Sequence, residues 1–290
     1  MVTSDTDILD LQQEPILLDS GCRRSNTVAL RYRAVQRAIS TMHERYMEQL
    51  TLPEIADAAQ LSPFHFDRVF RSMIGVSPGV FLASIRMKEA KRFLLMTKHS
   101  VTDICFDVGY TSLGTFSSRF TLLVGLPPGR FRRLAHEQIM RSSPHDMQSV
   151  VEHLQQRQAP FPGEGIRGTV HTTVPLHGLI FVGLFSSPLP QGQPVGCTIL
   201  TSGGRFCIPS VPDGTYHLFS AAMDQSQDFF TILAEGPRLH GGRGTPTVVV
   251  SHGRTSEERE IVLAPPSWAD PAITFAFPWL FMKLFHHYAG

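Results

Sequence analysis

Four side chains suited to recognising DNA bases recur along one predicted helical face. Phe64, Asp67, Arg68 and Arg71 are spaced i, i+3, i+4 and i+7, which puts them on one side of a helix. In the major groove an arginine can form two hydrogen bonds with guanine, and an apolar group can contact the thymine methyl. The alternative is that Phe64 lies in the core and that Asp67 and Arg71 form only a surface ion pair.

The segments around this face predict two short helices joined by a tight turn. Leu52 to Ala59 favours one helix, Gln60 to Ser62 a turn, and Pro63 to Ile74 a second helix that Ser62 caps. The opposite face of the second helix is apolar and is expected to close a core, through Phe66, Val69, Phe70, Met73 and Ile74. This arrangement is a helix-turn-helix, whose second helix enters the major groove.

A second unit of the same kind follows about 50 residues later. Ser100 to Val108 predicts a helix, Gly109 and Tyr110 a turn, and Ser112 caps another helix that runs to about Val124. Apolar residues at helical spacing are expected to form its core, namely Ile104, Cys105, Val108, Phe116, Phe120 and Leu123. We interpret Cys105 as a core thiol rather than a redox sensor.

The second unit carries a specific family resemblance. The string from Ser100 to Ser112, followed by Phe116-Ser-Ser-Arg-Phe120 and by Gly125-Leu-Pro-Pro-Gly-Arg-Phe-Arg132, resembles the signature of the AraC/XylS family of bacterial transcription regulators. Leu52 to Gly75 resembles the first unit of that family. The resemblance implies two recognition helices in successive major-groove segments, joined by a long helix over about 78–97.

The resemblance also assigns base-facing positions, one by one, to this chain. It places Phe64, Asp67 and Arg68 at base-facing sites of the first unit; the helical face itself adds Arg71. In the second unit it points to Leu113, Gly114, Thr115 and Ser118. The second unit departs from the family pattern, because Ser118 stands where arginine is usual. Arg119 follows one residue later, about 100° around the helix.

Basic and hydroxyl side chains near both units are candidates for contacts to DNA phosphates, which give affinity without sequence preference. They are Ser62, Lys88, Lys91, Arg92, Ser112, Arg119, Arg130, Arg132 and Arg133. Each of them could instead be a solvated surface charge or polar group. Arg86 is left out, because within the long helix it can turn inward to an acidic partner. Residues 27–135 carry a net charge of +7 and the remainder −6, which fits one segment that meets a polyanion.

The C-terminal part has a different residue pattern, with short runs of residues that favour β-strands between Gly and Pro turns. The runs are Gly178 to Phe185, Gly204 to Ile208, Thr215 to Ala221, Phe229 to Leu233, Thr247 to Val250 and Glu260 to Leu263. They predict a small sandwich. Gly168 to Val170, Gly204 to Ile208 and Val211 to Leu218 resemble the carboxypeptidase regulatory-like, transthyretin-like β-sandwich, whose members are generally interaction modules without catalytic residues.

The remaining residues point to no catalysis and no cofactor. No nucleophile, base and orienting group occur at recognisable spacing, so no catalytic residue and no enzyme activity are predicted. The four cysteines form no C-x-x-C pair and the histidines no H-x-x-x-H pair, so no metal site is predicted. The N-terminus lacks a secretory pattern, which favours the cytoplasm. The apolar run from Ile273 to Phe285 is too short for the 20 or so residues that cross a bilayer, and is expected to pack on the protein.

Together these features predict a multidomain chain: an all-α double helix-turn-helix domain followed by a small all-β sandwich. The expected divisions are a flexible lead-in at 1–26, the DNA-binding domain at 27–136, a linker at 137–166 and the sandwich at 167–290. The leading hypothesis is a sequence-specific regulator of transcription. Its expected partners are double-stranded DNA, RNA polymerase as for an activator, and a small-molecule effector or a second copy bound through the sandwich.

Two other functions remain open at this point. One is an architectural DNA-binding protein whose sandwich only mediates dimerisation. The other makes the C-terminal half an enzyme tethered to DNA. Effector-dependent DNA affinity would favour the regulator, dimerisation without such an effect the architectural protein, and turnover by the C-terminal half the enzyme.

Overall fold

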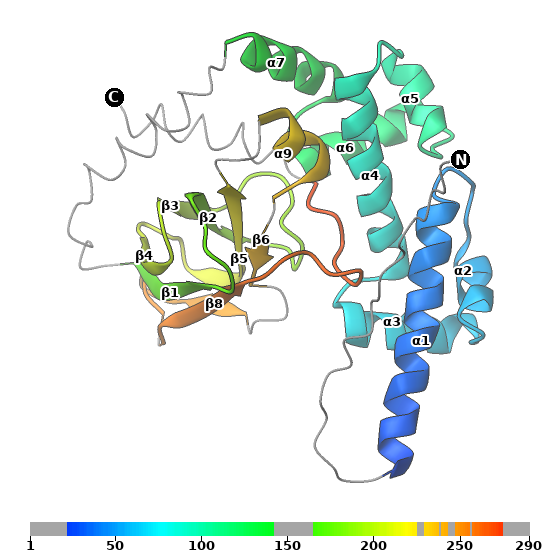
Figure 1. Cartoon of the computed structure of the whole chain (residues 1–290), viewed down its shortest axis with the longest axis horizontal. Helices are drawn as coiled ribbons and strands as arrows, with labels where there is room; N and C mark the ends of the chain where they lie inside the picture. Colours follow the sequence, from blue (N-terminus) through cyan, green and yellow to red (C-terminus); the bar gives the residue numbers. More distant parts are fainter. Residues whose placement is uncertain are drawn as a thin grey trace, which may run out of the picture.

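The computed structural model describes residues 22–141, 165–224, 229–237, 239–242, 247–255 and 257–274. Residues 1–21 of the predicted lead-in, most of the linker and residues 275–290, which include most of the apolar run, lie outside the described residues. Residues 22–26, also expected to be a flexible lead-in, belong instead to an α-helix that begins at Cys22. Two regions differ in secondary structure: an α-helical one up to Arg141 and a β-rich one from Ile166 (Figure 1).

The helical region is built around one long helix. Its helices are α1 (Cys22–Glu44), α2 (Leu52–Ala58), α3 (Pro63–Ile74), α4 (Pro78–Met96), α5 (Val101–Asp107), α6 (Leu113–Val124) and α7 (Pro128–Arg141). Helices α2 and α3 form the first predicted unit, α5 and α6 the second, and α4 connects them (Figure 1). The boundaries of both units therefore lie within a residue or two of those that the sequence indicates.

Local capping explains most of these boundaries. Thr51 and Ser100 each form a capping box with the acidic residue three positions later, which satisfies backbone N–H groups at the starts of α2 and α5. Ser77 and Ser112 cap α4 and α6 in the simpler way. The predicted cap at Ser62 is wrong, because its hydroxyl makes no capping hydrogen bond; Pro63 alone marks the start of α3.

Each unit packs its own apolar cluster against α4. The first cluster contains Phe66, Phe70 and Phe81, and the second contains Phe116, Phe120 and Phe131; all six rings are buried. Because α4 contributes to both clusters, its buried side chains fix the units relative to one another. Met73 was expected in the core, and helical spacing puts it on the face of Phe66 and Phe70. It is nevertheless 37% exposed, because it lies in the last turn of α3, where it borders a cavity.

The β-rich region forms two sheets. Its strands are β1 (Ile166–Thr172), β2 (Gly178–Phe185), β3 (Gly196–Leu200), β4 (Gly204–Ile208), β5 (Gly214–Asp224), β6 (Leu239–Gly241), β7 (Val248–Val250) and β8 (Arg259–Leu263). One sheet has the order β4-β1-β8 and the other β3-β2-β5-β6, with β7 paired to β5. Only β1 and β8 run parallel among the described pairs. Both sheets contribute to one apolar cluster, which includes Ile180, Phe206 and Tyr216.

One predicted strand is a helix. Residues Phe229 to Leu233 were expected to be extended, but they belong to the helix α9 (Phe229–Glu235). A short apolar run without alternation fits a buried strand or a buried helix equally well, so its surroundings decide. Here Leu233 and Ala234 are buried in the cluster of the second helix-turn-helix unit, on α4 and α7. The helical core therefore includes residues from beyond the predicted 27–136 boundary.

Two further segments connect the β-rich region to the helices. In the stretch after β8, the Trp268 indole N–H donates to the Tyr32 hydroxyl at 2.8 Å, and the backbone N–H of Ala272 donates to Ser84 Oγ at 3.2 Å. In the loop between β2 and β3, Leu189 joins the apolar cluster of the first unit. The two regions thus contact each other directly.

Candidate nucleic-acid interface

Helix α3 exposes the face that the sequence singled out. Phe64 is 82% exposed, so the alternative that it lies in the core is wrong. Arg68 and Arg71 are exposed beside it. The ion pair of that alternative is present, because Arg71 Nε donates to Asp67 Oδ2 at 2.8 Å. Because this pair lies on the surface, it adds little stability and can rearrange to meet another partner.

Helix α6 exposes a face of much smaller side chains. Leu113 is 40% exposed, and Gly114, Thr115 and Ser118 are exposed as well. The backbone N–H of Thr115 is already capped by Ser112 Oγ at 3.4 Å. Arg119 is exposed next to this face. With no long polar side chain at the four base-facing positions, α6 offers chiefly backbone, hydroxyls and its N-terminal dipole.

The turn of the second unit is packed tightly against the loop that precedes the first. Gly109 has a φ of +81°, and a Cβ atom added there would lie 2.6 Å from the Tyr46 carbonyl oxygen. Gln49 Nε2 also donates to the Gly109 carbonyl at 2.7 Å. The matching turn of the first unit has Gln60 at a φ of 58°, where a side chain is accommodated. Only the second turn therefore requires glycine.

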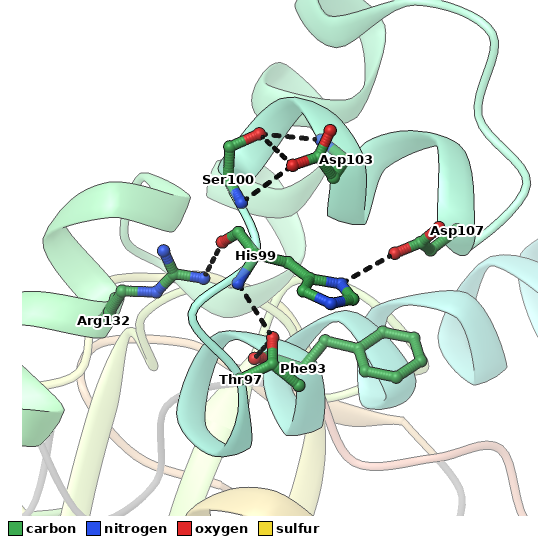
Figure 2. Close-up of polar contacts among 7 residues, drawn as sticks. All are labelled: Phe93, Thr97, His99, Ser100, Asp103, Asp107 and Arg132. Atoms are coloured by element: carbon green, nitrogen blue, oxygen red, sulfur yellow. Dashed lines mark hydrogen bonds and ion pairs between the residues drawn. The ribbon is translucent and has the colours of Figure 1, made fainter.

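Arg132 was expected to contact phosphate, and the structure contradicts this expectation. Its Nε donates to the Leu94 carbonyl at 3.0 Å. Its Nη2 donates to the His99 carbonyl at 2.6 Å (Figure 2). The guanidinium thus connects α7 to the last turn of α4 and to the segment between α4 and α5. Figure 2 also shows the capping box beside it, where Ser100 Oγ and Asp103 bond at 2.7 Å. The bonds from Ser100 lower the pKa of the Asp103 carboxyl.

Two other arginines make similar internal ties. Arg86 turns inward, as the sequence allowed, but its partners are the carbonyls of Tyr46 at 2.8 Å and Glu48 at 2.6 Å rather than an acidic side chain. Arg37 of α1 donates to the Ala58 and Ala59 carbonyls at 3.1 Å, at the end of α2. Sequence reasoning missed the roles of Arg37 and Gln49, because nothing in the local pattern marks a side chain whose partner lies 21 or 60 residues away.

Lys91 is the second phosphate candidate that the structure contradicts. It is 2% exposed, within α4, and its Nζ lies 3.4 Å from the Ile273 carbonyl. Burial, with a smaller effect from Lys88, lowers the pKa of Lys91 to about 7. A buried amine cannot reach a phosphate. The segment after β8 covers this part of α4.

The other basic candidates remain accessible to different degrees. Arg130 and Arg133, at the start of α7, are exposed. Lys88 and Arg92 are half-buried. Arg92 Nε donates to Glu89 at 2.7 Å, and the Arg92 guanidinium lies over the Phe93 ring.

Cys105 is buried, and its thiol approaches the Tyr110 carbonyl at 3.9 Å. Burial raises the pKa of the Cys105 thiol, which agrees with its interpretation as a thiol of the apolar core.

The described residues give no sign of a metal centre or a membrane span. No group of three or more His, Cys, Asp or Glu is placed to hold a metal ion in this part of the chain. No helix of the described ranges is long and apolar enough to cross a bilayer.

Comparison with known proteins agrees with the geometry of this region. Residues 55–134 match a family model described as a helix-turn-helix domain. An uncharacterised helix-turn-helix transcriptional regulator, YobQ of Bacillus subtilis, is 30% identical over 95 residues, which is 33% of this chain and 39% of YobQ. The bifunctional transcriptional activator and DNA repair enzyme AdaA of the same organism is 30% identical over 92 residues, 32% of this chain and 44% of AdaA.

A solved structure is similar to the same region. The DNA-binding domain of the global transcriptional factor AdpA, in complex with a target DNA, has 25% identity and a TM-score of 0.36, over 38% of this chain and 98% of that one. Residues 55–134 are thus similar to a helix-turn-helix domain that is also present in bacterial transcription regulators. The chain spans about two fifths of the length of the curated relatives named above, and these matches cover about a third of it.

Proposed function

We propose that this chain regulates transcription by binding double-stranded DNA with α3 and α6 in successive major-groove segments. The observation that most directly supports this proposal is the exposure of Phe64. Phe66 and Phe70 of the same helix are fully buried, whereas Phe64, at the start of α3, lies 82% in solvent beside Arg68. An exposed phenylalanine beside arginine on one helix face suits contact with thymine methyls and guanine edges. The helix-turn-helix relatives support the same function.

The two helices would contribute unequally. Helix α3 would supply base recognition through Phe64, Asp67, Arg68 and Arg71, with the Asp67–Arg71 pair opening to admit a base. Helix α6 would act chiefly through phosphates and DNA shape, with shallow contacts from Leu113, Gly114, Thr115 and Ser118. The phosphate set becomes Ser62, Lys88, Arg92, Ser112, Arg119, Arg130 and Arg133, without Lys91 and Arg132.

The β-rich region would serve regulation rather than DNA contact. We propose a transthyretin-like sandwich that senses an effector or mediates self-association, and RNA polymerase as the partner of the DNA-bound protein. Support comes from its attachment to both units through α9, the β2–β3 loop and the segment after β8.

Selection of bound sites from randomised duplexes at fixed salt tests the DNA-binding proposal with the full chain. We expect one asymmetric site with two contacted major-groove segments about 10 base pairs apart on the same face of the duplex. The segment contacted by α3 should carry most of the sequence information. Footprinting on the selected site would contradict the proposal if protection were confined to one groove segment, as would the absence of any enriched sequence.

A further inference from the structure

A cavity of about 510 Å³ lies between the first helix-turn-helix unit and the β-rich region. The last turn of α3, residues 72–76, forms one wall, and residues 187–190 of the β2–β3 loop form another. The rest is lined by β5, β6 and the segment after β8. This volume falls within the range of roughly 300–1,000 Å³ that is typical of small-molecule sites.

Aromatic residues line the cavity, which carries little charge. The rings of Phe219 and His240 stack with centroids 6.1 Å apart, and Phe185 meets Phe219 edge-on at 6.3 Å. Asp270 Oδ2 lies 3.4 Å from His240 Nε2, so the carboxylate in the lining is paired with a histidine. Among the described residues the lining contains neither lysine nor arginine. The described lining therefore offers no lysine or arginine partner for a phosphate or a carboxylate.

One polar group can orient a ligand in these surroundings. His217 of β5 also lines the cavity, and partial burial lowers the pKa of its imidazole. At neutral pH the ring is therefore predominantly uncharged, and a neutral imidazole has one nitrogen that accepts a hydrogen bond. A hydroxyl or amino group on an aromatic ring would supply the matching donor.

We propose that this cavity binds a small, uncharged, planar aromatic molecule that carries a hydroxyl or amino group. The molecule lies between the last turn of α3 and the stacked rings of Phe219 and His240. The effect of this molecule on DNA affinity rests on the proposed DNA-binding function.

The β2–β3 loop connects the cavity to both recognition helices. Within this loop, Leu189 is buried in the apolar cluster of the first unit. Three residues later, the backbone N–H of Gly192 donates to the Leu123 carbonyl of α6 at 3.2 Å. Thr274 Oγ1, from the segment after β8, bonds to the same carbonyl at 3.4 Å. A ligand that displaces this loop therefore changes contacts at the ends of α3 and α6 together.

Such contacts provide a physical route for regulation. A ligand shifts an equilibrium only when it binds two conformations with different affinity. A bound ligand stabilises one distance between the β2–β3 loop and the last turn of α3. It thereby stabilises one relative placement of the recognition helices α3 and α6. DNA requires a fixed spacing of those helices, so ligand and DNA affinities become coupled.

Calorimetric titration of the full chain with 2-naphthol tests the site. This probe is planar, uncharged at neutral pH and carries one hydroxyl; 2-naphthoate, with the same rings and a negative charge, is its control. We expect one site for 2-naphthol with a dissociation constant below about 1 mM, and binding of 2-naphthoate at least tenfold weaker. Equal binding of the two compounds, or no binding of 2-naphthol at that concentration, would overturn the assigned ligand class.

Two neighbouring substitutions locate the bound probe. Ser187→Phe places a ring in the cavity, whereas Ser186→Phe adds the same ring at an exposed position outside the lining. Ser187→Phe should weaken 2-naphthol binding about tenfold or more, and Ser186→Phe should change it less than about twofold. Circular dichroism confirms that both variants fold. If both bind the probe as the parent does, the probe lies elsewhere and the proposed site is wrong.

DNA binding is measured separately on the selected duplex, with and without 2-naphthol. We expect the probe to change the affinity of the parent and the Ser186→Phe variant at least threefold, and that of Ser187→Phe less. A parent chain that binds 2-naphthol but no DNA overturns the proposed function and leaves the site standing. A parent that binds DNA with unchanged affinity when saturated with the probe overturns the coupling.

Discussion

The two helix-turn-helix units share a framework but expose different chemistry. Phe66 and Phe70 of α3 correspond to Phe116 and Phe120 of α6, 50 residues later, and each helix ends at a left-handed glycine, Gly75 or Gly125. On the outward faces, α3 carries Phe64 and Arg68, whereas α6 carries glycine, threonine and serine. The same packing therefore supports two surfaces, one suited to base contacts and one to the DNA backbone.

The units also differ in how rigidly they are held. The turn of the second unit is pressed against the Tyr46 carbonyl and bonded to Gln49, and Arg132 ties its entry to α7. The first turn tolerates Gln60 and receives one arginine, Arg37, from α1. Where side chains offer little specificity, an accurately placed backbone matters more.

The two turns should respond very differently to alanine at their left-handed position. Gly109→Ala introduces a Cβ about 2.6 Å from the Tyr46 carbonyl oxygen at a left-handed φ, so the free energy of unfolding should fall by about 3 kcal/mol or more. Gln60→Ala, the matched change in the first turn, should alter it by less than about 0.5 kcal/mol. Urea unfolding measures both, and similar losses in the two variants would remove the difference between the turns.

Lys91 tests the helix that both units share. Its pKa is depressed to about 7 in the folded chain, whereas an unfolded lysine titrates near 10.4. Between these values the unfolded chain binds more protons, so stability should rise with pH by up to about 1.4 kcal/mol per pH unit. Below pH 7 Lys91 no longer makes the free energy of unfolding depend on pH, because its amine is protonated in both the folded and the unfolded chain.

The matched variant isolates this effect. Lys91→Met should be more stable than the parent at neutral pH, and the difference should shrink from pH 7 to pH 9 in urea unfolding. Its DNA affinity should show the parental salt dependence, because the buried amine is out of reach of phosphates. A shallower salt slope in Lys91→Met would show instead that this amine meets DNA.

Two adjacent arginines of α7 separate structure from DNA contact. Arg132→Ala removes two charge-assisted hydrogen bonds to backbone carbonyls and should cost about 1.5–3 kcal/mol of stability. Arg133→Ala, at an exposed position, should leave stability nearly unchanged and make the salt slope of DNA binding shallower by about 0.9. Reversed outcomes in unfolding and in salt titrations would restore Arg132 as the phosphate contact.

Single substitutions on the two outward faces test the unequal roles directly. Arg68→Ala should relax the preference at one base position of the α3 half-site, with a loss of about 1–3 kcal/mol of discrimination. Ser118→Ala should leave the selected motif almost unchanged, and Ser118→Arg should sharpen the α6 half-site. Selection experiments with all three variants give the answer. An unchanged motif for Arg68→Ala, or a degraded one for Ser118→Ala, would contradict the assignment.

Local sequence determined the helices of both units. Capping pairs such as Thr51 with Glu54, prolines at first helical positions and the spacing of buried phenylalanines act within one or two turns. Their energetics depend little on the rest of the chain. The exposed face of α3 follows from the same periodicity, because a buried face at helical spacing leaves its opposite side in solvent.

Tertiary contacts decided the roles of individual polar side chains. Lys91 is buried by Ile273, 182 residues away, and Arg132 bonds to a carbonyl 38 residues before it. Tertiary contacts also determine that α9 is a helix, because its residues pack on the second helix-turn-helix unit. The cavity likewise depends on tertiary structure, because its walls come from segments that are distant in the sequence. Sequence fixes which groups a helix carries, but the free energy of burying or pairing them depends on neighbours that only the folded chain supplies.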